Sequence, residues 1–341
     1  MVDPRPRVWV SQPLFDDVIE QLGQHVVLAT THEVTRYTPA MLAEQLAQVD
    51  GALITLNERI GAAEIANAPN LRVIANVGVG YNNLDVGALN AAGILASNTP
   101  DVLTETTADL GFALLMATAR RITESERWLR EGQWGQWSFQ TMLGADIHGS
   151  TLGILGMGRI GQGIARRGAL GFGMRVLYHN RSRLPDATEA EVGAQYVDLD
   201  TLLAQSDHLV LVLPYGPSSH HIIDATALAK MKPTATLVNI ARGGIVDELA
   251  LADALANGRL AAAGLDVFEG EPSVRPELLA LRNIVLTPHI GSASQATRRA
   301  MVQLAVDNLL AALGLGPNAG NPPSAINADA VAAKKIDDAK R

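Results

Sequence analysis

Three residues whose side chains can transfer protons or bind anions follow short apolar runs in this 341-residue sequence: Arg242, Glu271 and His289. A histidine can give or take a proton near neutral pH, and a carboxylate hydrogen-bonded to it fixes its tautomer. A guanidinium can hold a carboxylate through two parallel hydrogen bonds and polarise a neighbouring carbonyl. Each residue alone has an ordinary structural explanation. Together they predict a catalytic site with a proton donor, its orienting acid and an anion clamp.

A glycine-rich loop lies upstream of these residues, with Gly156, Gly158 and Gly161 at the G-x-G-x-x-G spacing. This spacing alone is common in ordinary loops. Here an apolar run precedes it, a helical pattern follows over 160–170, and a second strand is predicted over 174–178, which is the context of a dinucleotide-binding loop. The glycines allow a tight turn and a close approach of backbone to phosphate, while the helix N-terminus attracts the anion. We therefore expect Met157, Arg159 and Ile160 to lie against a dinucleotide as well.

The residues after the second strand favour NADP over NAD. A carboxylate at this point accepts hydrogen bonds from the ribose 2′-OH of NAD, whereas a 2′-phosphate requires cations. The sequence has Asn180 there, followed by Arg181, Ser182 and Arg183, and residues 151–185 contain six Arg and no Asp or Glu in a chain of net charge −8. Such a local positive field indicates an anionic ligand. In the alternative reading these arginines are solvated helix and loop residues, as we expect for 166 and 167.

Apolar runs that alternate with helical or turn-rich segments predict two α/β units with parallel sheets. In the first unit the runs lie at 8–10, 26–29, 52–55, 72–76 and 94–97. Leu56, Val77 and Gly78 follow two of them, at the strand ends where ligands of parallel sheets bind. In the second unit the runs continue at 208–213, 235–240, 262–267 and 283–286, with helices at 225–231 and 248–257.

The helices outside these units set the predicted domain boundaries. Residues 105–128 read as one long helix with a broad apolar face. A last helix over 292–313 is expected to return to the first unit. The predicted substrate-binding domain therefore consists of residues 1–100 together with 292–341, and residues 101–291 form the predicted dinucleotide-binding domain. The segment after Gly314 lacks apolar periodicity and is expected to be either packed down or disordered.

Residues 132–146 form an irregular arm that contains Trp134, Trp137, Phe139 and Met142. Apolar clusters of this kind mark interfaces, which predicts a homodimer. In the alternative the arm folds back on its own core.

Composition excludes several classes of protein. The chain is 48% hydrophobic and 18% charged, as in globular proteins, and its acidic balance argues against nucleic acid or an anionic membrane as a partner. Without cysteine there is no disulfide, thiolate metal site or cysteine nucleophile, and no metal site is predicted. The N-terminus has no apolar signal region and no run approaches 18 apolar residues, so a cytoplasmic enzyme is expected.

These motifs make the chain similar to the D-isomer-specific 2-hydroxyacid dehydrogenase family, especially its glyoxylate/hydroxypyruvate and 2-ketogluconate reductase branch. The resemblance extends from about residue 51 to residue 298 and is carried by segments 76–80, 99–104, 156–161, 213–214, 239–243, 263–268 and 287–292. It implies a Rossmann cofactor domain and a flavodoxin-like substrate domain. No regulatory domain is seen after the last helix, which argues against the longer phosphoglycerate dehydrogenases.

The resemblance also implies roles for individual residues. Arg242 would bind the substrate carboxylate and carbonyl, Glu271 would orient His289, and His289 would be the acid/base. The backbone N–H groups of Val77 and Gly78 would receive the substrate carboxylate. Further cofactor contacts are implied at the residues that match the motifs around it, namely Leu213, Pro214, Ile240, Ala241, Asp266 and Gly291, with Asp266 meeting the nicotinamide carboxamide.

The expected activity is NADPH-dependent reduction of a small 2-oxo acid to the D-2-hydroxy acid, with glyoxylate, hydroxypyruvate or 2-ketogluconate as the substrate. One alternative is an NAD-linked oxidase of D-hydroxy acids or phosphite. The other is a non-catalytic protein that senses a dinucleotide, and the complete set of arginine, glutamate and histidine argues against it.

Overall fold

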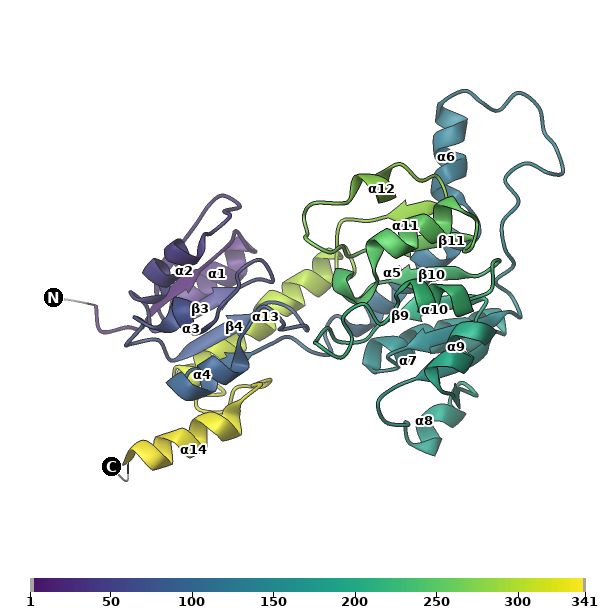
Figure 1. Cartoon of the computed structure of the whole chain (residues 1–341). Helices are drawn as coiled ribbons and strands as arrows, with labels where there is room; N and C mark the ends of the chain where they lie inside the picture. Colours follow the sequence, from purple (N-terminus) through teal and green to yellow (C-terminus); the bar gives the residue numbers. More distant parts are fainter. Residues whose placement is uncertain (1–2, 340–341) are drawn as a thin grey trace. The chain divides into compact units, whose positions relative to one another are not determined.

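The computed structural model describes residues 3–339, which divide into two compact units, 3–103 with 294–339 and 104–293 (Figure 1). In the part of the chain that the structure describes, no helix has the length and apolar character needed to cross a membrane.

The first unit is a five-stranded parallel sheet in the order β2-β1-β3-β4-β5. This is the flavodoxin-like order expected from the resemblance. Its strands are β1 (Arg7–Val10), β2 (Val27–Thr30), β3 (Gly51–Ile54), β4 (Val73–Asn76) and β5 (Leu95–Ser97). Its helices are α1 (Asp16–Gly23), α2 (Pro39–Leu46), α3 (Ala62–Ile65), α4 (Val86–Ala92), α13 (Gln295–Ala312) and α14 (Ala328–Ala339).

Both faces of this sheet are covered, which is why its strands are continuous apolar runs. Helices α1 and α13 pack on one face through a cluster that includes Val8, Leu53 and Leu309. Helices α2, α3 and α4 pack on the other through a cluster that includes Trp9 and Ile74.

The segment after Gly314 is packed against the first unit. The Asn327 side chain accepts a hydrogen bond from Ala96 N–H at 2.7 Å and donates to the Ile94 carbonyl at 3.0 Å. The backbone of Ile326 donates to Ala96 O at 2.8 Å. These contacts of residues 326 and 327 agree with the packed outcome and not with the disordered one. Helix α14 was not predicted, because its sequence has no clear apolar stripe.

The second unit is a seven-stranded parallel sheet in the order β12-β11-β10-β9-β6-β7-β8, which is the Rossmann order with one extra strand. Its strands are β6 (Thr151–Leu155), β7 (Arg175–His179), β8 (Gln195–Tyr196), β9 (His208–Leu211), β10 (Thr236–Asn239), β11 (Ala262–Leu265) and β12 (Ile284–Leu286). Its helices are α5 (Thr104–Ala119), α6 (Ile122–Arg130), α7 (Arg159–Arg166), α8 (Asp186–Ala190), α9 (Leu199–Gln205), α10 (Ala225–Lys230), α11 (Glu248–Ala256) and α12 (Pro276–Leu279). A π-helical turn (Arg167–Gly171) follows α7, and a 3-10 turn (Gly243–Ile245) follows β10.

Two apolar layers enclose this sheet. Helices α5 and α7 form one layer and α9 to α12 form the other. Several helices begin at side-chain N-caps that the sequence provides, for example Asp198, Asp224 and Asp247. The α/β fold with two parallel doubly wound sheets is thus confirmed.

The prediction of one long helix over 105–128 is wrong. Helix α5 ends at Ala119 and α6 begins at Ile122, because Arg121 adopts a left-handed conformation with φ of 52°. The Arg121 side chain donates to Glu124 Oε2 at 2.9 Å and to the Leu143 carbonyl at 3.2 Å. The chain changes direction at this break, and α6 and the arm that follows it extend away from the seven-stranded sheet (Figure 1).

His208 lies in the core of the second unit and links β9 to the end of the arm. Its Nε2 lies 3.0 Å from the Asp146 carbonyl and its Nδ1 lies 2.8 Å from Thr236 Oγ1. Since a carbonyl only accepts, Nε2 carries the proton and Nδ1 accepts from the hydroxyl. Burial lowers the pKa of His208 below its ordinary value, although the Asp146 carbonyl and Asp207 oppose this effect.

We expect His208 to make the second unit less stable in acid. Because its pKa is lower in the folded chain, the unfolded chain takes up the proton first, and the free energy of unfolding falls as the pH drops below about 6.5, by up to about 1.4 kcal/mol per pH unit. Chemical unfolding at pH 5, 6 and 7 would show this slope. His208→Gln should flatten it, and an equal slope in both proteins would contradict the assignment.

Candidate active site

The glycine loop joins β6 to α7 and has the shape that a pyrophosphate requires. Gly156 has φ of 98°, and a Cβ there would lie 2.7 Å from the Leu213 backbone nitrogen. A Cβ at Gly161 would lie 2.7 Å from the Gly156 carbonyl oxygen, whereas one at Gly158 would have no atom within 4 Å. The first and third glycines therefore allow close packing, and the second leaves open space beside the N-terminus of α7. These features fit a bound dinucleotide.

Asn180 lies directly against this loop. Its Oδ1 accepts a hydrogen bond from Met157 N–H at 2.6 Å, across 23 residues of sequence. The amide therefore holds the end of β7 to the glycine loop and contributes no negative charge there. An aspartate could make the same bond and would add that charge.

Arg183 and Arg181 differ in their surroundings. The Arg183 guanidinium donates to both oxygens of Glu189, at 2.9 and 2.6 Å. That carboxylate also accepts from Tyr178 Oη at 2.5 Å, so Arg183 and then Tyr178 hold the pKa of Glu189 at about 2. Burial, reinforced by Glu189, raises the pKa of Tyr178 to about 12. Arg181 is exposed, and among residues 3–339 no ion pair to it is found.

The expectation that Arg166 and Arg167 are simply solvated is wrong, because both form ion pairs. Arg166 Nη2 lies 2.7 Å from Glu105 Oε1, and Arg167 pairs with both Glu105 and Asp109 of α5. The positive field of residues 151–185 is therefore reduced by acids that are remote in sequence. Of the four arginines at 166, 167, 181 and 183, the first two and Arg183 form ion pairs, so Arg181 is the most available cation.

Arg242 follows β10 in a loop that the Asn239 side chain shapes. Asn239 accepts from Ala241 N–H at 3.0 Å and donates to the Arg242 carbonyl at 2.9 Å. A Cβ at Gly243 would lie 1.9 Å from the Phe268 carbonyl carbon, so only glycine lets this loop pack on the loop after β11. Burial lowers the pKa of the Arg242 guanidinium, and the charge of Glu271 opposes this effect. An arginine nevertheless stays charged at neutral pH.

Glu271 and His289 form a direct pair. His289 Nδ1 lies 2.8 Å from Glu271 Oε2, and Glu271 Oε1 accepts from Phe268 N–H at 2.8 Å. Burial alone would raise the pKa of Glu271, but the hydrogen bond and charge of His289 bring it below its ordinary value. The carboxylate is thus ionised and can only accept, so Nδ1 of His289 carries a proton. This leaves Nε2 to face a substrate.

Asp266 holds the loop that carries His289. Its Oδ1 accepts from Thr287 Oγ1 at 2.7 Å and from Ile290 N–H at 2.8 Å, while its Oδ2 accepts from Gly291 N–H at 2.9 Å. His289 N–H donates to the Asp266 carbonyl at 2.8 Å, and His289 has φ of 52°. Backbone conformations of this kind cost free energy in a non-glycine residue and persist where the surroundings impose them. Asp266 therefore fixes the direction of the imidazole.

The other predicted cofactor residues lie near the same strand ends. Leu213 and Pro214 follow β9, while Ile240 and Ala241 follow β10 and are buried. Arg159 and Ile160 begin α7, and Ser182 is exposed beside Arg181.

The predicted substrate residues of the first unit follow β3 and β4. Leu56 is exposed, and its loop is fixed by the buried Glu58, whose Oε2 accepts from Thr55 N–H at 2.8 Å. Val77 N–H donates to the Ile54 carbonyl at 2.8 Å, and Gly78 N–H lies 3.0 Å from the Asn76 carbonyl, two residues back. The first bond continues the sheet and occupies Val77 N–H, which the resemblance assigned to the substrate carboxylate, while the second is a three-residue turn contact.

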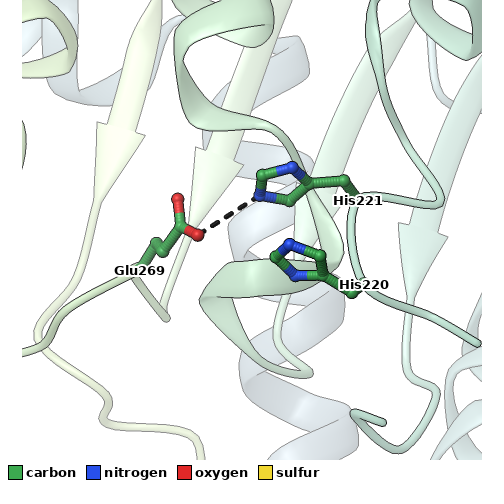
Figure 2. A group of neighbouring side chains, drawn as sticks. All are labelled: His220, His221 and Glu269. Atoms are coloured by element: carbon green, nitrogen blue, oxygen red, sulfur yellow. Dashed lines mark hydrogen bonds and ion pairs between the residues drawn. The ribbon is translucent and has the colours of Figure 1, made fainter. Parts of the chain in front are cut away.

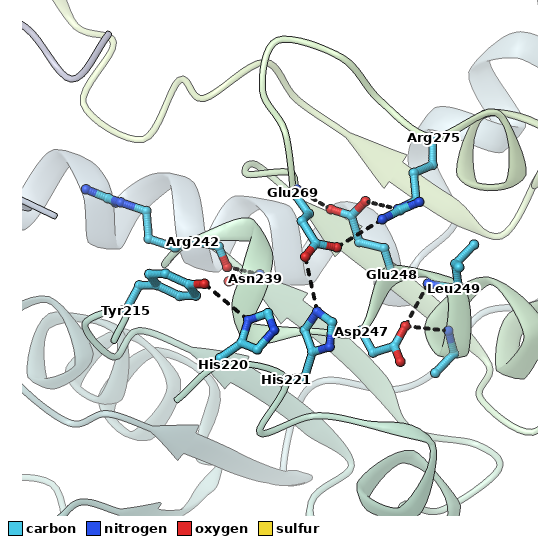
Figure 3. Close-up of polar contacts among 11 residues, drawn as sticks. Tyr215, His220, His221, Asn239, Arg242, Asp247, Glu248, Leu249, Glu269 and Arg275 are labelled. Atoms are coloured by element: carbon cyan, nitrogen blue, oxygen red, sulfur yellow. Dashed lines mark hydrogen bonds and ion pairs between the residues drawn. The ribbon is translucent and has the colours of Figure 1, made fainter. Parts of the chain in front are cut away.

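A charged cluster beside the Glu271 loop was not predicted. Glu269 Oε2 pairs with Arg275 Nη2 at 3.1 Å, and the buried Glu248 lies 3.3 Å from Arg275 Nε (Figure 3). Glu248 Oε1 also accepts from Glu269 N–H at 2.5 Å, and burial raises the pKa of Glu248. In the sequence, Glu248 is indistinguishable from an ordinary acidic residue in the first turn of a helix. Only the folded chain brings Glu248 next to the loop that carries Glu269.

The chain is similar to several known proteins. Residues 112–291 match the D-isomer specific 2-hydroxyacid dehydrogenase, NAD binding domain. A glyoxylate reductase from Thermococcus onnurineus is 44% identical over 338 residues, covering 97% of this chain and 98% of the relative. A glyoxylate/hydroxypyruvate reductase B from Klebsiella pneumoniae is 44% identical over 310 residues, covering 91% and 95%.

A solved structure is also similar. It is that of an NADPH-dependent glyoxylate/hydroxypyruvate reductase from Sinorhizobium meliloti in complex with NADP and malonate. It superimposes with a TM-score of 0.83 at 35% identity, covering 95% of this chain and 97% of the other.

Proposed function

Because the chain belongs to the D-isomer specific 2-hydroxyacid dehydrogenase family, we propose that it reduces a small 2-oxo acid to the D-2-hydroxy acid with NADPH. Glyoxylate and hydroxypyruvate are the proposed substrates, with 2-ketogluconate as a third candidate. The observation that carries this proposal is the pair of His289 and Glu271 at 2.8 Å beside the Arg242 loop. It supplies a proton donor of fixed tautomer next to a permanent cation.

The proposed roles follow from the chemistry of each side chain. NADPH, when bound, supplies the hydride that reduces the carbonyl carbon. His289 donates the proton to the carbonyl oxygen from Nε2, and Glu271 stabilises the imidazolium and its orientation. Arg242 holds the substrate carboxylate and stabilises the negative charge that develops on the oxygen. Gly78 is proposed to bind the carboxylate through its backbone N–H group, whereas Val77, whose N–H group already donates to the Ile54 carbonyl, is proposed only to line that loop. Leu56 is proposed to lie beside the substrate, and Asp266 to contact the nicotinamide carboxamide.

An absorbance assay at the nicotinamide wavelength tests this function. We expect NADPH to be consumed with glyoxylate or hydroxypyruvate. Binding of NADPH without turnover on any 2-oxo acid would favour the dinucleotide-sensing alternative. Faster oxidation of D-hydroxy acids or phosphite with NAD would favour the oxidase.

We expect the cofactor preference to depend on Arg181 and Asn180. Asn180→Asp keeps an acceptor for Met157 N–H but places a carboxylate beside the proposed 2′-phosphate, so the preference should move toward NADH. Arg181→Ala should lower kcat/KM for NADPH by about 10- to 100-fold, the worth of one charged hydrogen bond, with little change for NADH. Steady-state kinetics with both cofactors measures this.

Arg175→Ala is the matched control. Arg175 is the first residue of β7, at the end of the strand opposite to Arg181, and it contacts Gln195. Equal losses with NADPH and NADH in the Arg181 variant would rule out a contact with the 2′-phosphate.

A homodimer formed by the arm 132–146 is also proposed. Trp137 and Phe139 are 64% and 85% exposed, and Ile122 and Leu129 of α6 are exposed as well. This apolar surface is unusual for a monomer. Sedimentation velocity should give the mass of a dimer, and a monomer at micromolar concentration would refute it.

A further inference from the structure

Two successive histidines, His220 and His221, lie in the turn between β9 and α10. Their imidazole rings are stacked, with centroids 3.9 Å apart and planes inclined by 24°. His221 has φ of 48°, and its N–H donates to the Gly244 carbonyl at 2.8 Å. The turn is therefore held against the loop after β10. The result is that two neighbouring side chains point to the same side (Figure 2).

Glu269, from the loop after β11, faces both rings. Its Oε1 lies 3.2 Å from His221 Nε2, and one ligand atom from each of the three residues can be chosen so that all lie within 4.8 Å of one another. A tetrahedral zinc site with bonds of about 2.0–2.1 Å separates its ligand atoms by about 3.3 Å. The pair of His221 and Glu269 already has this separation. His220 is exposed, and its ligand atom also lies within 4.8 Å of the other two.

Tyr215 gives the cluster a supporting hydrogen bond. Its hydroxyl lies 3.1 Å from His220 Nδ1, which leaves Nε2 of His220 for another partner. A hydrogen bond to the second ring nitrogen is the usual support of a metal-binding histidine. Tyr215 is itself placed by Gly244, where a Cβ would lie 2.8 Å from the tyrosine ring.

The charges around His220, His221 and Glu269 are compatible with a bound cation. Arg275 lies beside Glu269 at 3.1 Å, but it is shared with the buried Glu248 at 3.3 Å (Figure 3). One guanidinium thus faces two carboxylates. Imidazole nitrogen with one carboxylate oxygen suits Zn²⁺, Co²⁺ and Ni²⁺ and is a poor set for Mg²⁺ or Ca²⁺, which prefer oxygen alone.

We propose that His220, His221 and Glu269 form a binding site for one divalent transition-metal ion of the zinc class, with water as the fourth ligand. Among residues 3–339 this is the one group of three such side chains with ligand atoms close enough. Glu269 lies two residues before Glu271, so the ion would tie the turn after β9 to the loop that carries Glu271. No metal site was predicted from the sequence, although two histidines in succession after a strand are the signal that could have suggested one.

Metal binding to the full chain, purified without a polyhistidine tag and treated with chelator, tests the proposal. Co²⁺ should give visible d–d absorption that saturates at one ion per chain. Zn²⁺ added in a calorimetric titration should displace the bound Co²⁺. His220→Asn should weaken binding at least about 10-fold, and Tyr215→Phe should weaken it by about 10-fold through loss of the supporting bond. His148→Asn, an exposed histidine outside the cluster, is the matched control and should bind as the wild type does.

His220→Asn leaves the bond between His221 and Glu269 in place, and NADPH titration of each variant verifies that the second unit is folded. Glu269→Gln should also abolish the Co²⁺ spectrum. Absence of saturable binding in the wild type would overturn the proposal. Equal affinity in the wild type and in folded His220→Asn would overturn it as well.

Discussion

Replacement of His289 by glutamine should lower kcat with glyoxylate by about 10²- to 10⁴-fold, the range that a general acid contributes. Glutamine can still donate a hydrogen bond to Glu271 Oε2, which His289 Nδ1 contacts at 2.8 Å, so the loop should keep its shape. It cannot release a proton to the carbonyl oxygen. Single-turnover kinetics isolates this step, and NADPH binding should change less than about threefold, because His289 acts on the substrate.

Two variants accompany this experiment. His148→Gln makes the same replacement at an exposed histidine and should leave turnover unchanged. Glu271→Gln should give a smaller loss than His289→Gln, because it removes the orienting charge and keeps the proton donor. Turnover of His289→Gln within tenfold of the wild type would remove His289 from the proposed mechanism.

Replacement of Arg242 by alanine should lower kcat/KM by about 10³-fold or more, because one side chain serves both ground-state binding and the transition state. Loss of a charged donor at a developing oxyanion costs about 10²- to 10³-fold in kcat. Loss of the clamp on the substrate carboxylate should raise KM in addition. Both constants are therefore expected to change.

Arg242→Lys separates charge from geometry. Lysine keeps the charge but cannot make two parallel hydrogen bonds, so only a partial recovery of kcat/KM is expected. Arg282→Ala removes an exposed arginine elsewhere in the same unit and should leave kcat/KM unchanged. Asn239 holds the backbone of the Arg242 loop, so NADPH affinity of the variant should stay near that of the wild type. A change in KM alone would show that Arg242 only binds substrate.

Most strands were predictable because a strand buried on both faces is a continuous apolar run. The runs at 8–10 and 208–213 became β1 and β9 with small changes at their ends. The two-residue strand β8 was missed because both of its residues are exposed. The break at Arg121 was missed because no glycine or proline marks it. It depends on contacts with Glu124 and Leu143 that form only in the folded chain.

Charge was the least predictable property. A run of arginines from 159 to 183 reads as a positive field, but Glu105, Asp109 and Glu189 neutralise several of its members. The group of Glu248, Glu269 and Arg275 was unpredictable for the same reason. The residues that flank each of them in the sequence give no sign of an ion pair. Whether an ion pair forms depends on which helices and loops lie side by side in the folded chain.

The sequence by itself determined the parallel sheets, the glycine loop and the identities of the arginine, glutamate and histidine, because apolar periodicity, glycine conformation and side-chain chemistry are local properties. Tertiary structure alone decided that Asn180 holds the glycine loop, that Arg183 is engaged by Glu189, and that Asp266 directs the His289 loop. The first and third of these contacts join residues more than 20 positions apart, and the second depends on how the turn after β7 folds onto α8. A hydrogen bond forms only where the folded chain brings donor and acceptor within about 3 Å of each other.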